Sequence, residues 1–188
     1  IKTFIRDPAQ WSQIVILLGI LIIYMANLRS DYIQGNPRRI FGDKWTVALI
    51  FFNLGATCFI LSIITTRFVY PMLSLEGKQY WALGLAPVPR ERIVYEKYIL
   101  CWIISFVITE SLMVFSSIVL NVRPGMFFLS CFIVLLVSFG LTSLAVGLGA
   151  ISPNFRQDNP ARIANGLGGT LNVVLSMAYI GAIMALFI

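Results

Sequence analysis

Three polar side chains inside long apolar runs are the residues of this chain best placed to do chemistry. Glu110 is the only acidic residue between Tyr98 and Val122. A charged carboxylate at the middle of a bilayer costs about 2.5–3.5 kcal/mol on insertion scales, so Glu110 must face protein or water, or carry a proton. It is therefore a candidate for substrate or proton contact. A protonated Glu110 that hydrogen-bonds a neighbouring helix is the structural alternative.

Asn53 and Asn172 are amides in two other apolar runs. Asn53 shares a helix face with Thr57, four residues later, and Asn172 is followed by Ser176 at the same spacing. Such groups in membrane helices hydrogen-bond a neighbouring helix more often than they bind a ligand. We therefore keep Glu110, Asn53 and Asn172 as intramembrane polar candidates and assign no catalytic residue.

The other reactive groups form no recognisable catalytic set. The sequence has no His, and each of its three Cys stands alone in an apolar run, so neither a metal site nor a redox pair is predicted. A P-loop is missing too, because Gly77-Lys78 lacks both the earlier glycine and the following Ser or Thr of G-x-x-x-x-G-K-[ST]. A membrane-embedded lipid-modifying enzyme stays open as an alternative function. It would draw on the acidic residues Glu76, Glu91, Glu96 and Asp158.

The composition predicts the elements that must position these residues. Of 188 residues, 59% are apolar and 12% charged, and the mean hydropathy is +0.87, which is typical of an integral membrane protein. We predict an all-α membrane protein with a bundle of about five transmembrane helices. Their expected ranges are 8–28, 45–66, 98–122, 126–151 and 163–188. Residues 29–44, rich in turn formers and charge, are expected to form an aqueous loop.

Residues 1–188 are expected to form a single transmembrane domain, which we take to be a fragment because Ile1 is not an initiator Met. Residues 1–10 place apolar side chains at positions 1, 4 and 5, as in a short interfacial helix. The net charge of +6 is spread between the apolar runs, which favours loops at a lipid bilayer over a nucleic-acid partner.

The stretch 71–90 is too apolar for a flexible linker and too charged to cross a bilayer. Ser74-Leu75-Glu76 can begin a short helix, with Glu76 in the first turn, and Pro87 ends it. Tyr80 and Trp81 place aromatic rings on this helix. The helix either lies among lipid headgroups or docks into a groove of a soluble partner. Both functions stay open on the residues alone.

The distribution of basic residues predicts the orientation in the membrane. Nine of the 14 Lys and Arg fall on the side of 1–10, 67–97 and 152–162, and five fall on the other. The positive-inside rule therefore makes the first side cytoplasmic.

Three segments carry a resemblance to a known family. The first is Leu73-Ser74-Leu75-Glu76-Gly77-Lys78 through Trp81-Ala82-Leu83, then Ala86-Pro87-Val88 and Lys97. The others are Arg6-Asp7-Pro8-Ala9-Gln10-Trp11 and Pro153-Asn154-Phe155-Arg156-Gln157-Asp158-Asn159-Pro160. In this order relative to the apolar runs, they resemble the ABC-2-type permeases, the membrane subunits of many ATP-binding-cassette exporters, over nearly the whole chain.

The resemblance implies a permease subunit of an ABC exporter without an ATPase site. A separate nucleotide-binding subunit would hold ATP and Mg²⁺ and drive the bundle through 71–90, a cytoplasmic coupling helix. A second permease half, as a dimer or fused, and a bacterial inner membrane are also implied. The family plan has six spans, so five agree with a truncation after Ile188. An assembly or scaffold protein without a transport cycle is a further alternative.

The resemblance also implies two sets of docking residues. The expected coupling-helix residues are Leu75, Glu76, Gly77, Lys78, Tyr80, Trp81 and Pro87. The expected residues of the second cytoplasmic loop are Asn154, Phe155, Arg156, Asp158 and Asn159.

Overall fold

The computed structural model describes Gly19 and residues 37–76, 89–120, 122–155 and 159–186. These residues form helices joined by short turns, and the described part of the chain contains no strand. The long helices are α3 (Pro37–Ile64), α5 (Arg90–Val119), α6 (Pro124–Ile151) and α8 (Leu167–Leu186). The short ones are the π-helix η1 (Thr65–Val69), the 3-10 turns η2 (Tyr70–Met72) and η3 (Ser74–Glu76), and α7 (Pro160–Ala164).

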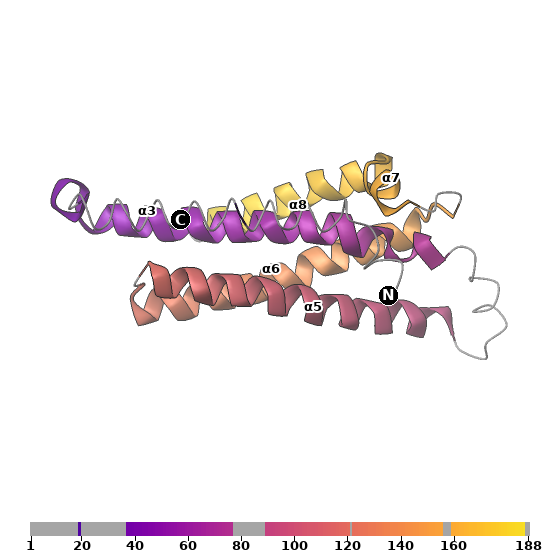
Figure 1. Ribbon diagram of the computed structural model, residues 1–188, viewed down its shortest axis with the longest axis horizontal. Helices are drawn as coiled ribbons and strands as arrows, with labels where there is room; N and C mark the ends of the chain where they lie inside the picture. Colours follow the sequence, from indigo (N-terminus) through magenta and orange to yellow (C-terminus); the bar gives the residue numbers. More distant parts are fainter. Residues whose placement is uncertain (1–18, 20–36, 77–88, 121, 156–158, 187–188) are drawn as a thin grey trace.

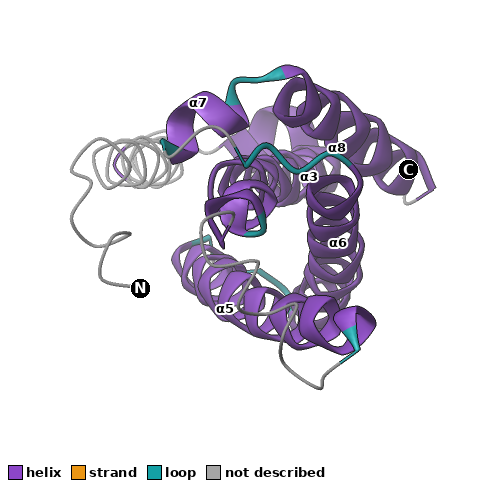
Figure 2. Cartoon of the chain, turned by 90° about the vertical axis from the view of Figure 1, so that its right-hand side faces the viewer, coloured by secondary structure: helices purple, strands orange, loops and turns teal. Residues whose placement is uncertain are grey.

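The long helices run side by side as an elongated bundle (Figure 1). In the end-on view, α5, α6 and α8 lie around α3 (Figure 2). Helices α3 and α6 form the middle of the bundle, because each packs against the other and against both α5 and α8. The short elements η2, η3 and α7 lie together at one end (Figure 1).

Four of the described helical segments are long and apolar enough to cross a membrane. They are Val47–Met72, Glu91–Val119, Pro124–Ile151 and Leu167–Leu186. The predicted all-α fold is therefore confirmed for the described residues, and four of their helices have the length and apolar composition expected of membrane spans. The expected fifth span, 8–28, and the expected interfacial helix, 1–10, lie outside the described residues apart from Gly19, which is helical.

Three predicted boundaries were wrong for local reasons. Helix α3 begins at Pro37, inside the expected aqueous loop, because proline is well suited to the first position of a helix. Helix α5 begins at Arg90, eight residues before the expected span, because the charged residues at its start continue the same helix. The expected span 163–188 is divided, since Asn165 and Gly166 separate α7 from α8.

The interior contains two apolar clusters that each join several helices, and a third, smaller one around Ile60 and Ile64 of α3. The first cluster joins all four long helices and includes the fully buried Leu61, Met113 and Leu141, together with Ile180. The second lies toward the end that holds η2 and α7, and it includes Tyr70, Cys101, Ala145 and Ile163. Because both clusters draw side chains from several helices, they hold these helices in one bundle.

Two glycines of α6 permit close approach of neighbouring elements. The ring of Tyr179 on α8 occupies the place where Gly140 would carry a Cβ atom. A Cβ on Gly149 would lie 2.7 Å from the backbone oxygen of Tyr70 in η2. Gly147, in the same helix, has no described atom within 4 Å of its Cβ position. Only some glycines of this helix are therefore contact sites.

We expect Gly149→Ala to destabilise the bundle, because the added methyl group meets a backbone oxygen that cannot rotate away. Overpacking of this kind costs about 1–3 kcal/mol. The check is the midpoint of thermal unfolding of the detergent-purified protein. Gly147→Ala is the matched control and should keep the midpoint or raise it, because its added methyl group meets no described atom and Ala is the better helix former. Equal midpoints for both variants would show that η2 does not press on α6.

Candidate functional site

At one end of the bundle, α3 changes into other helical forms before the chain leaves it. Pro71 has no N–H group, and in an α-helix its ring would clash with the carbonyl group of Arg67, one turn earlier. The preceding turn is instead the wider π-helix η1, in which the N–H of Tyr70 bonds the carbonyl oxygen of Thr65. The 3-10 turn that contains Pro71 follows. π-helical turns of this kind are frequent at functional sites.

The end of this segment is joined to the turn that follows α6. The backbone N–H of Asn154 donates to the Ser74 hydroxyl oxygen over 3.0 Å, and Ser74 is buried. The hydroxyl groups of Tyr70 and Ser152 lie 3.4 Å apart. We call the surface formed by Tyr70–Glu76, Ser152–Phe155 and α7 the platform. It brings together segments about 80 residues apart in the sequence.

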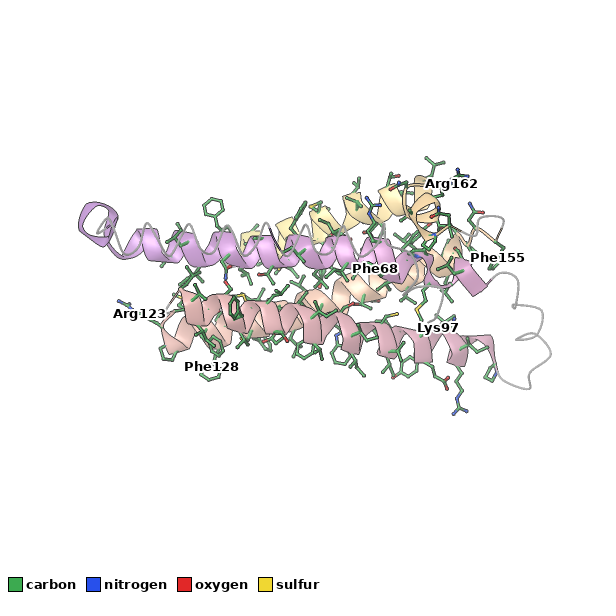
Figure 3. All side chains as sticks on the ribbon, viewed as in Figure 1. Phe68, Lys97, Arg123, Phe128, Phe155 and Arg162 are labelled. Carbon is green, nitrogen blue, oxygen red and sulfur yellow. The ribbon has the colours of Figure 1, made fainter. Side chains whose placement is uncertain are left out.

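The last element of the platform, α7, has a side-chain cap at its N-terminus. The side-chain oxygen of Asn159 accepts a hydrogen bond from the N–H of Ala161, which caps α7. Lys97, Phe155 and Arg162 lie at the platform end of the bundle, whereas Arg123 lies at the opposite end (Figure 3). Leu75 is 40% exposed, and Asn154 and Phe155 are exposed too, so these side chains are available for contact with another surface.

A second polar region lies inside the bundle, where α3, η1, α6 and α8 meet. The amide nitrogen of Asn172 donates to the Thr66 hydroxyl oxygen over 2.7 Å, and Thr66 donates to the backbone oxygen of Ser62 over 2.8 Å. We call the five side chains of this region the polar layer. They are Ser62, Thr66, Thr142, Asn172 and Ser176, all of them buried.

The polar layer is incompletely paired within the described protein. Four of its side-chain oxygens have no protein partner there: Ser62 Oγ, Thr142 Oγ1, Asn172 Oδ1 and Ser176 Oγ. A buried polar atom without a partner costs about 1–3 kcal/mol. The polar layer is therefore a site with unused hydrogen-bonding capacity.

The other two intramembrane candidates lie elsewhere. Asn53 links α3 to α5, because its side-chain oxygen accepts a 2.5 Å hydrogen bond from the Ser116 hydroxyl, and its nitrogen lies 3.8 Å from the sulfur of Met113. Glu110 of α5 is half-buried and shares a side-chain hydrogen bond with Cys131 of α6. The structure thus does not gather the three candidates into one site.

Several predicted docking residues lie outside the described part of the chain. These are Gly77, Lys78, Tyr80, Trp81, Pro87, Arg156 and Asp158. Glu76 ends the 3-10 turn η3, so what the structure describes of the expected helix is this single turn. Sequence reasoning missed Tyr70, Ser74 and Ser152, and it also missed Ser62 and Thr142. The sequence shows Ser, Thr and Asn residues inside the apolar runs, which signals hydrogen bonds between helices. It does not show which helices are neighbours.

The described residues form no catalytic arrangement that we recognise. No group of three or more His, Cys, Asp or Glu side chains among them could hold a metal ion. The two polar regions are built almost entirely from hydroxyl, amide and backbone groups. This chemistry suits hydrogen bonding and contact between surfaces.

We expect Ser74→Ala to loosen the platform, because it removes the oxygen that accepts from the backbone N–H of Asn154. Loss of a hydrogen bond worth about 1 kcal/mol corresponds to roughly five-fold faster exchange of that N–H. Hydrogen exchange followed by mass spectrometry measures it. Ser111→Ala is the control, since the exposed Ser111 bonds the Val107 carbonyl of its own helix. Unchanged exchange at Asn154 would contradict the link.

A family model described as "Putative ATP-binding cassette" matches residues 1–187. No curated protein and no solved structure matches the chain in the corresponding comparisons. The family description corrects the sequence analysis on identity. The family is an ATP-binding cassette family, so the assignment to the ABC-2-type permeases was wrong. That assignment rested on three short motifs, which are weaker than a match along nearly the whole chain.

Other predictions fail on the same finding. The predicted function as a permease subunit of an exporter is contradicted, and the lipid-modifying enzyme and the scaffold protein find no support either. An ATP-binding cassette family implies an ATPase site, which contradicts both the predicted lack of one and the prediction that ATP and Mg²⁺ belong to a separate subunit.

The described residues do not fit ATP. A phosphate site needs free backbone N–H groups on a glycine-rich loop at a helix start, usually with a lysine. Gly166–Thr170, at the start of α8, is glycine-rich but is filled by the chain itself. A Cβ on Gly168 would meet the Tyr70 hydroxyl, and one on Gly169 would meet the backbone oxygen of Ala164. We therefore assign no step to ATP at these residues.

The match covers nearly the whole sequence. It does not change the observation that four described helices are long and apolar enough to cross a membrane. The chain belongs to the family described as an ATP-binding cassette.

Proposed function

We propose that this chain forms the membrane-spanning region of an ATP-binding cassette protein that works in an ABC transporter. The platform would be the place where ATP-dependent movement reaches the helices. Two findings support this proposal: the family match over residues 1–187 and the four helices that are able to cross a membrane.

The observation that carries the proposal is the connection made at the platform. The bonds from Ser74 to Asn154 and from Tyr70 to Ser152 join the end of the α3 segment to the turn between α6 and α7. A force applied there would reach both α3 and α6 and shift one against the other. Such concerted displacement of packed helices is one of the common forms of conformational change in proteins.

The proposal includes an orientation and a contact surface. The platform would face the cytoplasm of a bacterial cell, with the helices in the inner membrane, in keeping with the excess of Lys and Arg on that side. The stretch 71–90 would act as the coupling helix, and the exposed Leu75, Asn154 and Phe155 would contact the moving surface. A second copy of the bundle, or a fused second half, would lie beside it in the bilayer.

Site-directed cross-linking tests this proposal. The native cysteines Cys58, Cys101 and Cys131 are replaced by Ala, and the pair Ser74→Cys and Asn154→Cys is introduced into the full-length protein in native membranes. We expect MgATP to change the yield of a short bifunctional cross-linker at least two-fold, because the two halves of the platform would move relative to each other.

The control is the pair Asn53→Cys and Ser116→Cys, which lies inside the bundle between α3 and α5. Its yield should respond less to MgATP than that of the platform pair. If MgATP and a non-hydrolysable analogue leave the platform pair unchanged, the proposed role of the platform is wrong.

A further inference from the structure

The polar layer forms one level across three helices, as the surrounding contacts indicate. Asn172 of α8 bonds Thr66, and Met184 of α8 lies 3.5 Å from the Cβ position of Gly55 on α3, so these two helices run in opposite directions. Ser176 follows Asn172 by one turn, and Ser62 precedes Thr66 by one turn. Ser62 and Ser176 therefore lie at the same height in the bundle.

Thr142 of α6 lies at this height as well. Gly149 of α6 touches Tyr70 of η2, and α6 runs parallel to α3. Thr142 precedes Gly149 by two turns, so both share the face toward α3. Two turns before Tyr70 the chain is at Ile63, next to Ser62. Three fully buried hydroxyl groups from three helices thus lie at one height near the middle of the membrane-spanning segments.

These hydroxyl groups do not donate to a backbone carbonyl oxygen of their own helix, as hydroxyl groups in helices commonly do. Thr57, Thr66 and Thr109 each donate to the carbonyl oxygen four residues earlier. The hydroxyl oxygens of Ser62, Thr142 and Ser176 have no partner in the described protein. Asn172 Oδ1, which can only accept, is also without one. A group outside the described protein that both donates and accepts would satisfy all four atoms.

We propose that the polar layer is a binding site for ordered water within the membrane-spanning bundle. Water both donates and accepts, and buried water commonly makes about three hydrogen bonds to otherwise unpaired polar groups. It would donate to Asn172 Oδ1 and exchange hydrogen bonds with the three hydroxyl groups. The five side chains of the layer are all uncharged, which suits a neutral ligand such as water.

The water site lies directly before the π-helix η1. The bond from Asn172 to Thr66 connects η1 to α8, and water beside it can replace that bond when the helices shift. The site would therefore ease movement between η1 and α8, a role that does not depend on where ATP acts.

Thiol hydrogen exchange tests the proposal. Single-cysteine versions of the full-length protein carry Ser176→Cys or Ser62→Cys, with the native cysteines replaced by Ala. Infrared spectroscopy in D₂O follows the change from S–H to S–D. Both thiols should exchange at least ten-fold faster than the control thiol, because each would contact water.

The control is a protein that keeps only the native Cys58. This thiol is 1% exposed, stands one turn before Ser62 on α3 and packs in the apolar cluster with Leu61 and Met113. Adding Thr142→Val to Ser176→Cys should slow exchange at position 176, because one partner of the water is lost. Equal exchange at positions 62, 176 and 58 in folded protein would show that the layer is dry and overturn the proposal.

Discussion

A polar group inside a bilayer has no bulk solvent to bind, and this constraint determines which parts of the molecule can change. The helical backbone satisfies its own N–H and C=O groups, so the side chains decide how the helices meet. Asn53 is hydrogen-bonded to Ser116 across α3 and α5. Movement of one of these helices past the other would break that buried bond. The polar layer is different, because Asn172 is bonded to Thr66 on one side and has an unused oxygen on the other.

Pro71 links this constraint to the platform. Because Pro71 cannot continue an α-helix, the chain forms η1 and η2, and these turns direct Ser74 toward Asn154. This irregular backbone belongs to both regions, because Thr66 of the polar layer lies in η1 and η2 is part of the platform. A movement that starts at the platform would therefore reach the polar layer first, while the apolar cluster around Leu61 and Met113 keeps the rest of the bundle together.

The sequence predicted the membrane helices better than it predicted their contacts or the family. The uncharged run 126–151 differs from α6 by two residues, because a long apolar run can hardly be anything else. The starts of α3 at Pro37 and of α5 at Arg90 were misjudged, because charged residues were taken to lie outside the helices. Both helices in fact extend beyond their apolar parts. The pairing of Asn172 with Thr66 depends on which helix faces meet, which no single span encodes. The family was misjudged because the assignment relied on three short motifs, whereas the family model compares residues 1–187.

Labelling of cysteines from each side of the membrane tests the central claim, that the described helices span a bilayer with the platform at one face. Helix α6 offers the most direct case, because Arg123 precedes its first residue and Asn154 follows its last by three. Arg123→Cys and Asn154→Cys, each as a single cysteine in sealed vesicles, are treated with a membrane-impermeant maleimide. The account predicts labelling from opposite faces. Labelling of both from the same face would contradict it.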